Sequence, residues 1–161
     1  MTTTWRELMF TAKKFFEDRE TMDDVDAFAS PMAARKLQIL LVEDDEPDAY
    51  LIRRALAGNP RVGAVVLAET GVEALALIDE GAISPDLAII DLHMPRMDGL
   101  ALLQDLATRE RAWFPSVVLT SSASPADARR ALGCGAAEFV TKPDTPDKLA
   151  AALDLAIRNL A

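Results

Sequence analysis

Short aliphatic runs recur along the chain from Leu37 onward. They occupy residues 37–43, 62–69, 85–91, 115–120 and 136–141. Runs that are apolar at nearly every position are typical of strands buried on both faces in a parallel sheet. The stretches between them, roughly ten to fourteen residues each, repeat their apolar positions at helical spacing. Five strands alternating with five helices predict a doubly wound α/β domain whose right-handed crossovers place helices on both faces.

Prolines and capping residues mark where the predicted helices begin. These are Pro47, Ser124 followed by Pro125, Thr145 followed by Pro146, and the capping-box pair Thr70 and Glu73. A proline fits the first helical position, and a Ser or Thr side chain before it accepts a free backbone N–H. The last helix carries its apolar face on Leu149, Leu153, Ala156 and Leu160.

Residues 1–36 do not follow this alternation and are predicted to be an N-terminal helical extension and linker, separate from a domain at 37–161. A capping box at 4–7 precedes an apolar stripe made of Trp5, Leu8, Met9, Ala12, Phe15 and Phe16. The charged stretch that follows reaches Pro31 and reads as a linker. Two interpretations stay open: a helix or tail belonging to its own domain, or a helix that docks a partner or a second copy.

Composition narrows the classes of function. Half of the 161 residues are hydrophobic, no apolar stretch approaches the roughly 18 residues of a membrane span, and the N-terminus does not resemble a signal peptide. The net charge of −9 argues against binding nucleic acid through a basic face. The single cysteine, Cys134, excludes an internal disulfide and fits a reducing cytoplasm, where we expect it to be structural.

Charged and hydroxyl side chains collect where the predicted strands end. The first strand ends in Glu43-Asp44-Asp45, the third in Asp91, the fourth in Thr120, and the fifth is followed by Lys142. Ligands of parallel sheets bind beyond these carboxyl ends. Carboxylates crowded there suit Mg²⁺, and an Asp between that cation and a lysine can act as a nucleophile toward phosphorus. Taken one at a time, the acids could instead cap helices, as Asp45 or Glu46 would for the helix at Pro47.

Four ordered motifs resemble the receiver domain of two-component response regulators over residues 37–161. They are "ILLVEDD", "DLHMPRMDGL", "VVLTSSA" and "FVTKP", and Thr120 and Lys142 are 22 positions apart. The resemblance implies a flavodoxin-like (βα)5 fold with strand order 2-1-3-4-5.

The resemblance also implies a metal and phosphoryl site. Asp91 would accept a phosphoryl group from a sensor histidine kinase or a histidine phosphotransfer protein. Asp44 and Asp91 would bind Mg²⁺ directly, Glu43 through a metal-bound water, and His93 through its backbone carbonyl. A shift by one residue, giving Asp44 and Asp45 as the acidic pair, remains the alternative.

Further roles follow from the same resemblance. Thr120 would hydrogen-bond the phosphoryl group, Lys142 would bridge to it, and Phe139 would be the rotating aromatic switch where the family often has tyrosine. The bond between Lys142 and Pro143 is commonly cis in this family. The His93 ring is expected to be solvated, with the hypothesis that His93 and Ser122 set the lifetime of the aspartyl phosphate.

Partners are predicted only in outline. In this family the fourth helix, fifth strand and fifth helix of the domain usually form the output surface. Arg129 and Arg130 are therefore candidates for contact with an unknown output protein, and a homodimer could use this surface or the N-terminal helix. Trp113 and Phe114 are expected to pack against the preceding helix.

The expected function is that of a stand-alone cytoplasmic response regulator, because the chain ends one helix after the fifth strand. It would catalyse only its own phosphorylation and dephosphorylation. A phosphate-independent scaffold is one alternative. An aspartyl-nucleophile phosphatase is another, although such an enzyme would need a second acid where this chain has His93.

Overall fold

The computed structural model describes residues 35–110 and 112–161, and residues 35–161 form one compact unit. The prediction of an N-terminal helix in residues 1–36 falls, except for Arg35 and Lys36, outside the described residues.

The sheet has five parallel strands in the order β2-β1-β3-β4-β5, as predicted. The strands are β1 Leu37–Val42, β2 Val62–Ala68, β3 Leu87–Ile90, β4 Ser116–Thr120 and β5 Glu138–Thr141. β1, β3 and β4 are almost entirely buried, which explains why their sequences lack the alternation of a half-exposed strand. The order reverses between β1 and β3, so both carboxyl ends lie at the topological switch point where α/β sheets bind ligands.

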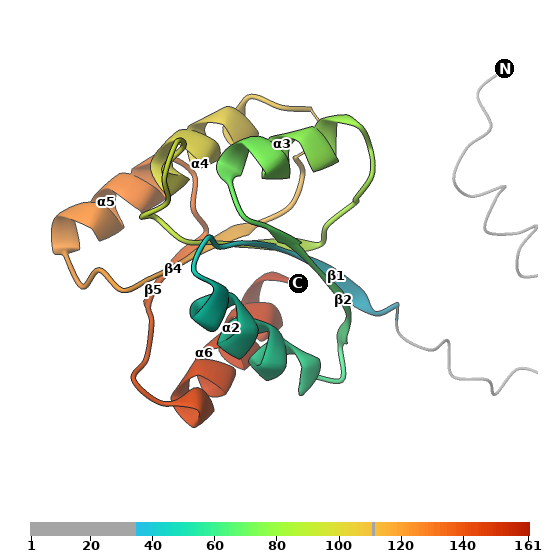
Figure 1. Cartoon of the computed structure of the whole chain (residues 1–161), viewed down its shortest axis with the longest axis vertical. Helices are drawn as coiled ribbons and strands as arrows, with labels where there is room; N and C mark the ends of the chain where they lie inside the picture. Colours follow the sequence, from blue (N-terminus) through green and yellow to red (C-terminus); the bar gives the residue numbers. More distant parts are fainter. Residues whose placement is uncertain (1–34, 111) are drawn as a thin grey trace, which may run out of the picture. The chain divides into compact units, whose positions relative to one another are not determined.

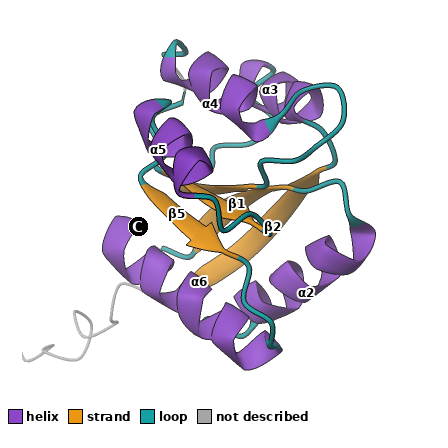
Figure 2. Cartoon of the chain, turned by 90° about the vertical axis from the view of Figure 1, so that its left-hand side faces the viewer, coloured by secondary structure: helices purple, strands orange, loops and turns teal. Residues whose placement is uncertain are grey.

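Five helices cover the two faces of this sheet (Figures 1 and 2). They are α2 Glu46–Ala57, α3 Gly71–Asp79, α4 Gly99–Ala107, α5 Pro125–Gly133 and α6 Pro146–Leu160. α3, α4 and α5 lie on one face, and α2 and α6 lie on the other. This arrangement confirms the predicted doubly wound fold.

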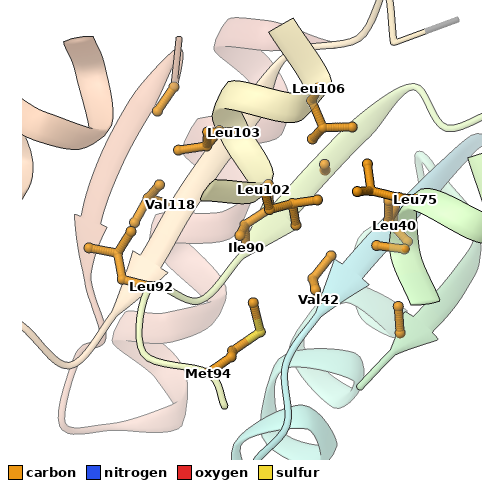
Figure 3. Close-up of a cluster of buried hydrophobic side chains, with 14 of the residues drawn as sticks. Leu40, Val42, Leu75, Ile90, Leu92, Met94, Leu102, Leu103, Leu106 and Val118 are labelled. Atoms are coloured by element: carbon orange, nitrogen blue, oxygen red, sulfur yellow. The ribbon is translucent and has the colours of Figure 1, made fainter. Parts of the chain in front are cut away.

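Each face has its own hydrophobic core because successive strand residues point in opposite directions. Leu40 and Val42 of β1 enter the core under α3, α4 and α5, which Figure 3 shows with Leu102 and Leu106 of α4. The neighbouring strand residues, such as Leu41, enter the core under α2 and α6. The sheet is thereby packed on both of its faces.

Every described helix begins at a side chain that accepts a backbone N–H. The caps are Asp45, Thr70, Asp98, Ser124 and Thr145. The predicted caps at Thr70, Ser124 and Thr145 are confirmed. Because Asp45 caps α2, the helix starts at Glu46, and Pro47 occupies its second position rather than the first.

The packing expected for Trp113 is wrong, whereas that of Phe114 is confirmed. Phe114 packs against the core that contains α4, but Trp113 is 89% exposed. Adjacent residues in extended chain point to opposite sides, so only one of the two can face the core.

None of the helices in the described part of the chain is long and apolar enough to cross a membrane.

Candidate functional site

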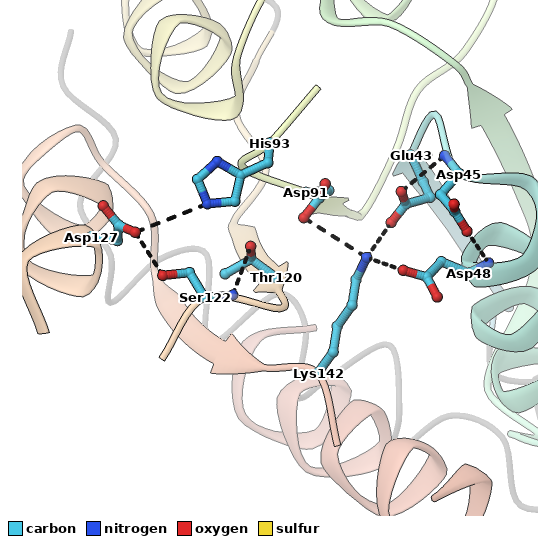
Figure 4. A network of polar contacts seen from close by, with 9 residues as sticks. All are labelled: Glu43, Asp45, Asp48, Asp91, His93, Thr120, Ser122, Asp127 and Lys142. Atoms are coloured by element: carbon cyan, nitrogen blue, oxygen red, sulfur yellow. Dashed lines mark hydrogen bonds and ion pairs between the residues drawn. The ribbon is translucent and has the colours of Figure 1, made fainter. Parts of the chain in front are cut away.

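The side chains that end β1, β3, β4 and β5 meet at the carboxyl edge of the sheet (Figure 4). Glu43 follows β1, Asp91 follows β3, Thr120 ends β4 and Lys142 follows β5. The structure thus brings together four groups that are up to 99 residues apart in the chain. Parallel pairing through the central strands causes this convergence, since all carboxyl ends then lie at one edge.

Three carboxylates of this edge form a cluster that suits a divalent cation. Glu43, Asp44 and Asp91 each offer an oxygen, and these oxygens all lie within 4.8 Å of one another. Glu43 and Asp91 are buried, whereas Asp44 is exposed, so the cluster is reached from solvent on the Asp44 side. Oxygen ligands of this charge are those that Mg²⁺ prefers, and a cation there would relieve the repulsion between the carboxylates.

Asp45 does not join this cluster. Its side chain accepts the backbone N–H of Asp48 at 2.9 Å, and its own N–H donates to Glu43 Oε1 at 3.1 Å. The structure therefore places Glu43 and Asp44 beside Asp91, which is the arrangement expected from the first of the two alternative pairings.

The Lys142 ammonium lies among carboxylates at the same edge. Its Nζ donates to Glu43 Oε2 at 2.7 Å and to Asp48 Oδ2 at 2.6 Å, and it lies 3.8 Å from Asp91 Oδ1 (Figure 4). Sequence reasoning missed Asp48. The signal in the sequence was its position in the first turn of α2, directly after the acidic run. An acidic residue there is equally explained by its favourable interaction with the helix dipole.

Burial and pairing act in opposite directions on these two charges. Burial raises the pKa of the Glu43 carboxyl above its ordinary value, more than the hydrogen bond from Lys142 lowers it. Burial also lowers the pKa of Lys142, but the hydrogen bonds to Asp48 and Glu43 outweigh it, so the pKa of Lys142 is raised. The lysine therefore holds a positive charge at neutral pH beside Asp91.

The Lys142–Pro143 bond is trans, since no cis peptide bond occurs in the described residues. The expectation of a cis bond is therefore wrong for this structure. The two isomers of a bond before proline differ by only about 0.5–1 kcal/mol, so the surrounding chain decides between them.

Thr120 and Ser122 extend the site toward α5. Thr120 is fully buried, and its Oγ1 accepts the backbone N–H of Ser122 at 3.4 Å. Ser122 Oγ donates to Asp127 Oδ2 at 2.6 Å, and His93 Nε2 lies 4.0 Å from the same oxygen. The two predicted tuning residues thus share one carboxylate, Asp127, which sequence reasoning missed because an acid in the first turn of α5 is ordinary helix chemistry.

The other predicted residues are not members of the Glu43–Asp44–Asp91 cluster. The His93 side chain is largely exposed. Phe139 is half-buried and packs against the core under α3, α4 and α5. Arg130 lies 3.9 Å from Asp127, and Cys134 is half-buried with Sγ accepting from Gln104 at 3.5 Å.

The loop after Asp91 is shaped by close backbone contacts. Gly99 N donates to the Leu92 carbonyl at 2.9 Å, and a Cβ on Gly99 would overlap the carbonyl oxygen of Asp91. Asp98 caps α4, so the Asp98-Gly99 pair both starts the helix and lets it approach the strand end. Arg96 adopts a φ of 73°, a left-handed conformation that costs energy for a residue with a Cβ.

Chemically, the site places the buried Asp91 carboxylate at the same edge of the sheet as the Lys142 ammonium, the Thr120 hydroxyl and the carboxylates of Glu43 and Asp44. This combination suits phosphoryl transfer to Asp91: a carboxylate nucleophile, a fixed positive charge, and a place for a metal ion.

Comparison with known proteins agrees with this geometry. The response regulator receiver domain family matches residues 39–154. The transcriptional regulatory protein KdpE of Mycobacterium tuberculosis is 38% identical over 127 residues, which are 76% of this chain and 52% of KdpE. A protein-glutamate methylesterase/protein-glutamine glutaminase of Anaeromyxobacter dehalogenans is 36% identical over 68% of this chain and 30% of its own length. The chain thus spans about half or less of the curated relatives it matches.

Solved structures give the same picture. The phosphorylated cyanobacterial phytochrome response regulator RcpA superposes with a TM-score of 0.70 at 28% identity, covering 75% of this chain and 91% of RcpA. The Mn(2+)-bound form of response regulator Rcp1 superposes with a TM-score of 0.65 at 25% identity, covering 73% of this chain and 88% of Rcp1.

Proposed function

The chain belongs to the response regulator receiver domain family of two-component signal transduction, and from this premise we propose that it accepts a phosphoryl group on Asp91. The donor would be a phosphohistidine of a sensor histidine kinase or a histidine phosphotransfer protein. One observation carries the proposal: buried Asp91 belongs to a cluster of three carboxylates, and the Lys142 ammonium lies 3.8 Å from its Oδ1.

In the transfer step an Asp91 carboxylate oxygen attacks the phosphorus of the donor phosphohistidine. An O–P bond forms while the P–N bond breaks, and the electron pair of that bond stays on the imidazole nitrogen. Lys142 supplies a positive charge for the phosphoryl oxygens, and the Thr120 hydroxyl can donate a hydrogen bond to them.

The residues present fit a magnesium ion. Glu43, Asp44 and Asp91 supply clustered oxygen ligands, and the His93 backbone carbonyl follows Asp91 by two residues. When bound, Mg²⁺ would neutralise the negative charge of the carboxylates and of the incoming phosphoryl group. A related receiver, Rcp1, is described in a Mn(2+)-bound form, and RcpA in a phosphorylated form, which supports both parts of the proposal.

The signal would leave the site through protein–protein contacts. Thr120 moves toward the phosphoryl group, Phe139 turns inward, and the surface formed by α5, β5 and α6 changes. Arg129 and Arg130 lie on that surface, which would contact an output protein or a second copy. We propose that the protein acts as a cytoplasmic response regulator, with a receiver domain at residues 37–161 and an N-terminal extension at residues 1–36. Its chemistry is limited to gaining and losing its own phosphoryl group.

Incubation with Mg²⁺ and acetyl phosphate tests the proposal. We expect one phosphoryl group per chain by intact-mass spectrometry, absent in Asp91→Asn and retained in Asp147→Asn, a control that neutralises an exposed acid of α6. A folded protein that gains no phosphoryl group would refute the proposal in favour of a scaffold. Catalytic turnover of an external phosphate ester would refute it in favour of a phosphatase.

The lifetime of the phosphorylated form tests the tuning residues separately. His93→Ala and Ser122→Ala should each change the decay rate of the phosphorylated protein, because both side chains contact Asp127 at the edge of the site. Decay rates equal to that of the unaltered protein would exclude the tuning role while leaving Asp91 as the acceptor.

A further inference from the structure

Asp48 contacts Lys142 without belonging to the carboxylate cluster. The clustered acids are Glu43, Asp44 and Asp91, whereas Asp48 comes from the first turn of α2. Its contact with Lys142 Nζ, at 2.6 Å, is nevertheless as short as the contact of Glu43 at 2.7 Å. The site therefore holds two kinds of acid: three that can share a cation, and one, Asp48, that lies outside this cluster and accepts a hydrogen bond from Lys142.

The two hydrogen bonds determine where the ammonium rests. A lysine ammonium has three N–H donors, and Glu43 and Asp48 take two of them. Asp91 Oδ1 lies 3.8 Å away, beyond hydrogen-bond distance. The lysine is thus hydrogen-bonded to Asp48 of α2 and to Glu43, which follows β1, but not to the acceptor carboxylate of Asp91.

Glu43 and Asp48 differ in what else competes for them. A cation bound in the carboxylate cluster would weaken the contact between Glu43 and Lys142, because two positive charges would then share the Glu43 carboxylate. Asp48 lies outside that cluster, so a metal ion there would not share its carboxylate with the lysine. A phosphoryl group on Asp91 must therefore compete mainly with Asp48 for the ammonium.

We propose that Asp48 is a positioning residue that restrains Lys142 in the unphosphorylated form and that releases it when a phosphoryl group occupies Asp91. This inference rests on the proposed role of Asp91 as the acceptor. Asp48 thereby sets how strongly the unphosphorylated state is favoured over the phosphorylated one. It does so through Lys142, since it is not a member of the Glu43–Asp44–Asp91 cluster.

Affinity for beryllofluoride, a stable analogue of the phosphoryl group, tests the restraint at saturating Mg²⁺. Removing a contact present only in the resting state favours the occupied state, so Asp48→Asn should bind about threefold to tenfold tighter, the factor expected for a partly exposed charge-assisted contact. Glu46→Gln is the matched control: it removes the same charge from the same turn of α2, where Glu46 is exposed. Equal affinities for Asp48→Asn and Glu46→Gln, or weaker binding by Asp48→Asn, would overturn the restraint.

Stability of the metal-free protein tests the resting contact without any phosphoryl analogue. Asp48→Asn should lower the urea midpoint more in the presence of Lys142 than in a Lys142→Met background, where only the interaction of Asp48 with the helix dipole is lost. The same loss in both backgrounds would mean that Asp48 acts on α2 alone and would overturn the inference. If the unaltered protein binds no beryllofluoride, the proposed function fails, and this cycle still decides whether Asp48 holds the lysine.

Discussion

Replacing Lys142 with methionine should destabilise the metal-free protein strongly, because it removes the cation that lies within 3.8 Å of three carboxylates, those of Glu43, Asp48 and Asp91. Methionine has a similar length and leaves Glu43, which is 2% exposed, and buried Asp91 without a compensating charge. Removing one partner of a fully buried ion pair costs about 3–5 kcal/mol, whereas an exposed pair contributes about 0–1 kcal/mol.

The structure places this site between those two limits. The Lys142 side chain is 14% exposed and that of Asp48 is 37% exposed, so water screens part of the interaction. We therefore expect a loss of about 2–4 kcal/mol in the free energy of unfolding. In a domain of this size each kcal/mol shifts the melting temperature by about 4 °C, which predicts a drop of roughly 8–16 °C.

Urea denaturation followed by far-UV circular dichroism at pH 7 measures this loss, with a chelator and again with saturating Mg²⁺. The metal ion should restore more stability in Lys142→Met than in the unaltered protein, because it replaces the missing positive charge and meets no competing ammonium. Lys148→Met is the control, since Lys148 and its partner Asp144 are both largely exposed and contribute little. A loss in Lys142→Met no larger than in Lys148→Met would refute the electrostatic reasoning.

Three further predictions concern the loops and the acids of the site. Gly99→Ala should destabilise the protein by about 2 kcal/mol or more and slow phosphorylation, because its Cβ would overlap the Asp91 carbonyl. Gly133→Ala is the control: no atom lies within 4 Å of the new Cβ, so this variant should be neutral or stabilising in the same denaturation assay. Arg96→Gly should raise the unfolding free energy by up to about 1 kcal/mol, since glycine accepts the φ of 73° without strain; a loss of stability would contradict this. Finally, the raised pKa of Glu43 means that the folded protein holds this proton more tightly than the unfolded chain does. The unfolding free energy of the metal-free protein, measured relative to that of Glu43→Gln, should therefore fall as pH rises through the window between 4.5 and the raised pKa. Mg²⁺ affinity should weaken as pH falls through the same window, because protonated Glu43 is a poorer metal ligand. Calorimetry measures both quantities.

The fold could be predicted because its signals are local. The buried strands β1, β3 and β4 are short aliphatic runs, and helix caps such as Ser124 and Thr145 are read from neighbouring residues. The convergence of Asp91 and Lys142 also follows from the alternation of strands and helices, since that alternation requires parallel strands with their carboxyl ends at one edge.

The contacts within the site could not be predicted in the same way. An acid in the first turn of a helix is favoured by the helix dipole wherever it occurs, so the chain alone does not separate Asp48, which binds Lys142, from Glu46, which is exposed. The same holds for Asp127, whose link to Ser122 and His93 depends on how two loops approach α5.

Chain order and residue type thus account for which groups arrive at the carboxyl edge, including Asp91, Thr120 and Lys142. Three-dimensional packing decides which acids cluster, which acids accept hydrogen bonds from Lys142, and which side chains remain exposed to water. The physical reason is distance. Strand and helix formation depends on residues a few positions apart, whereas the electrostatics of the site depend on gaps of a few ångströms between groups that lie up to 99 residues apart.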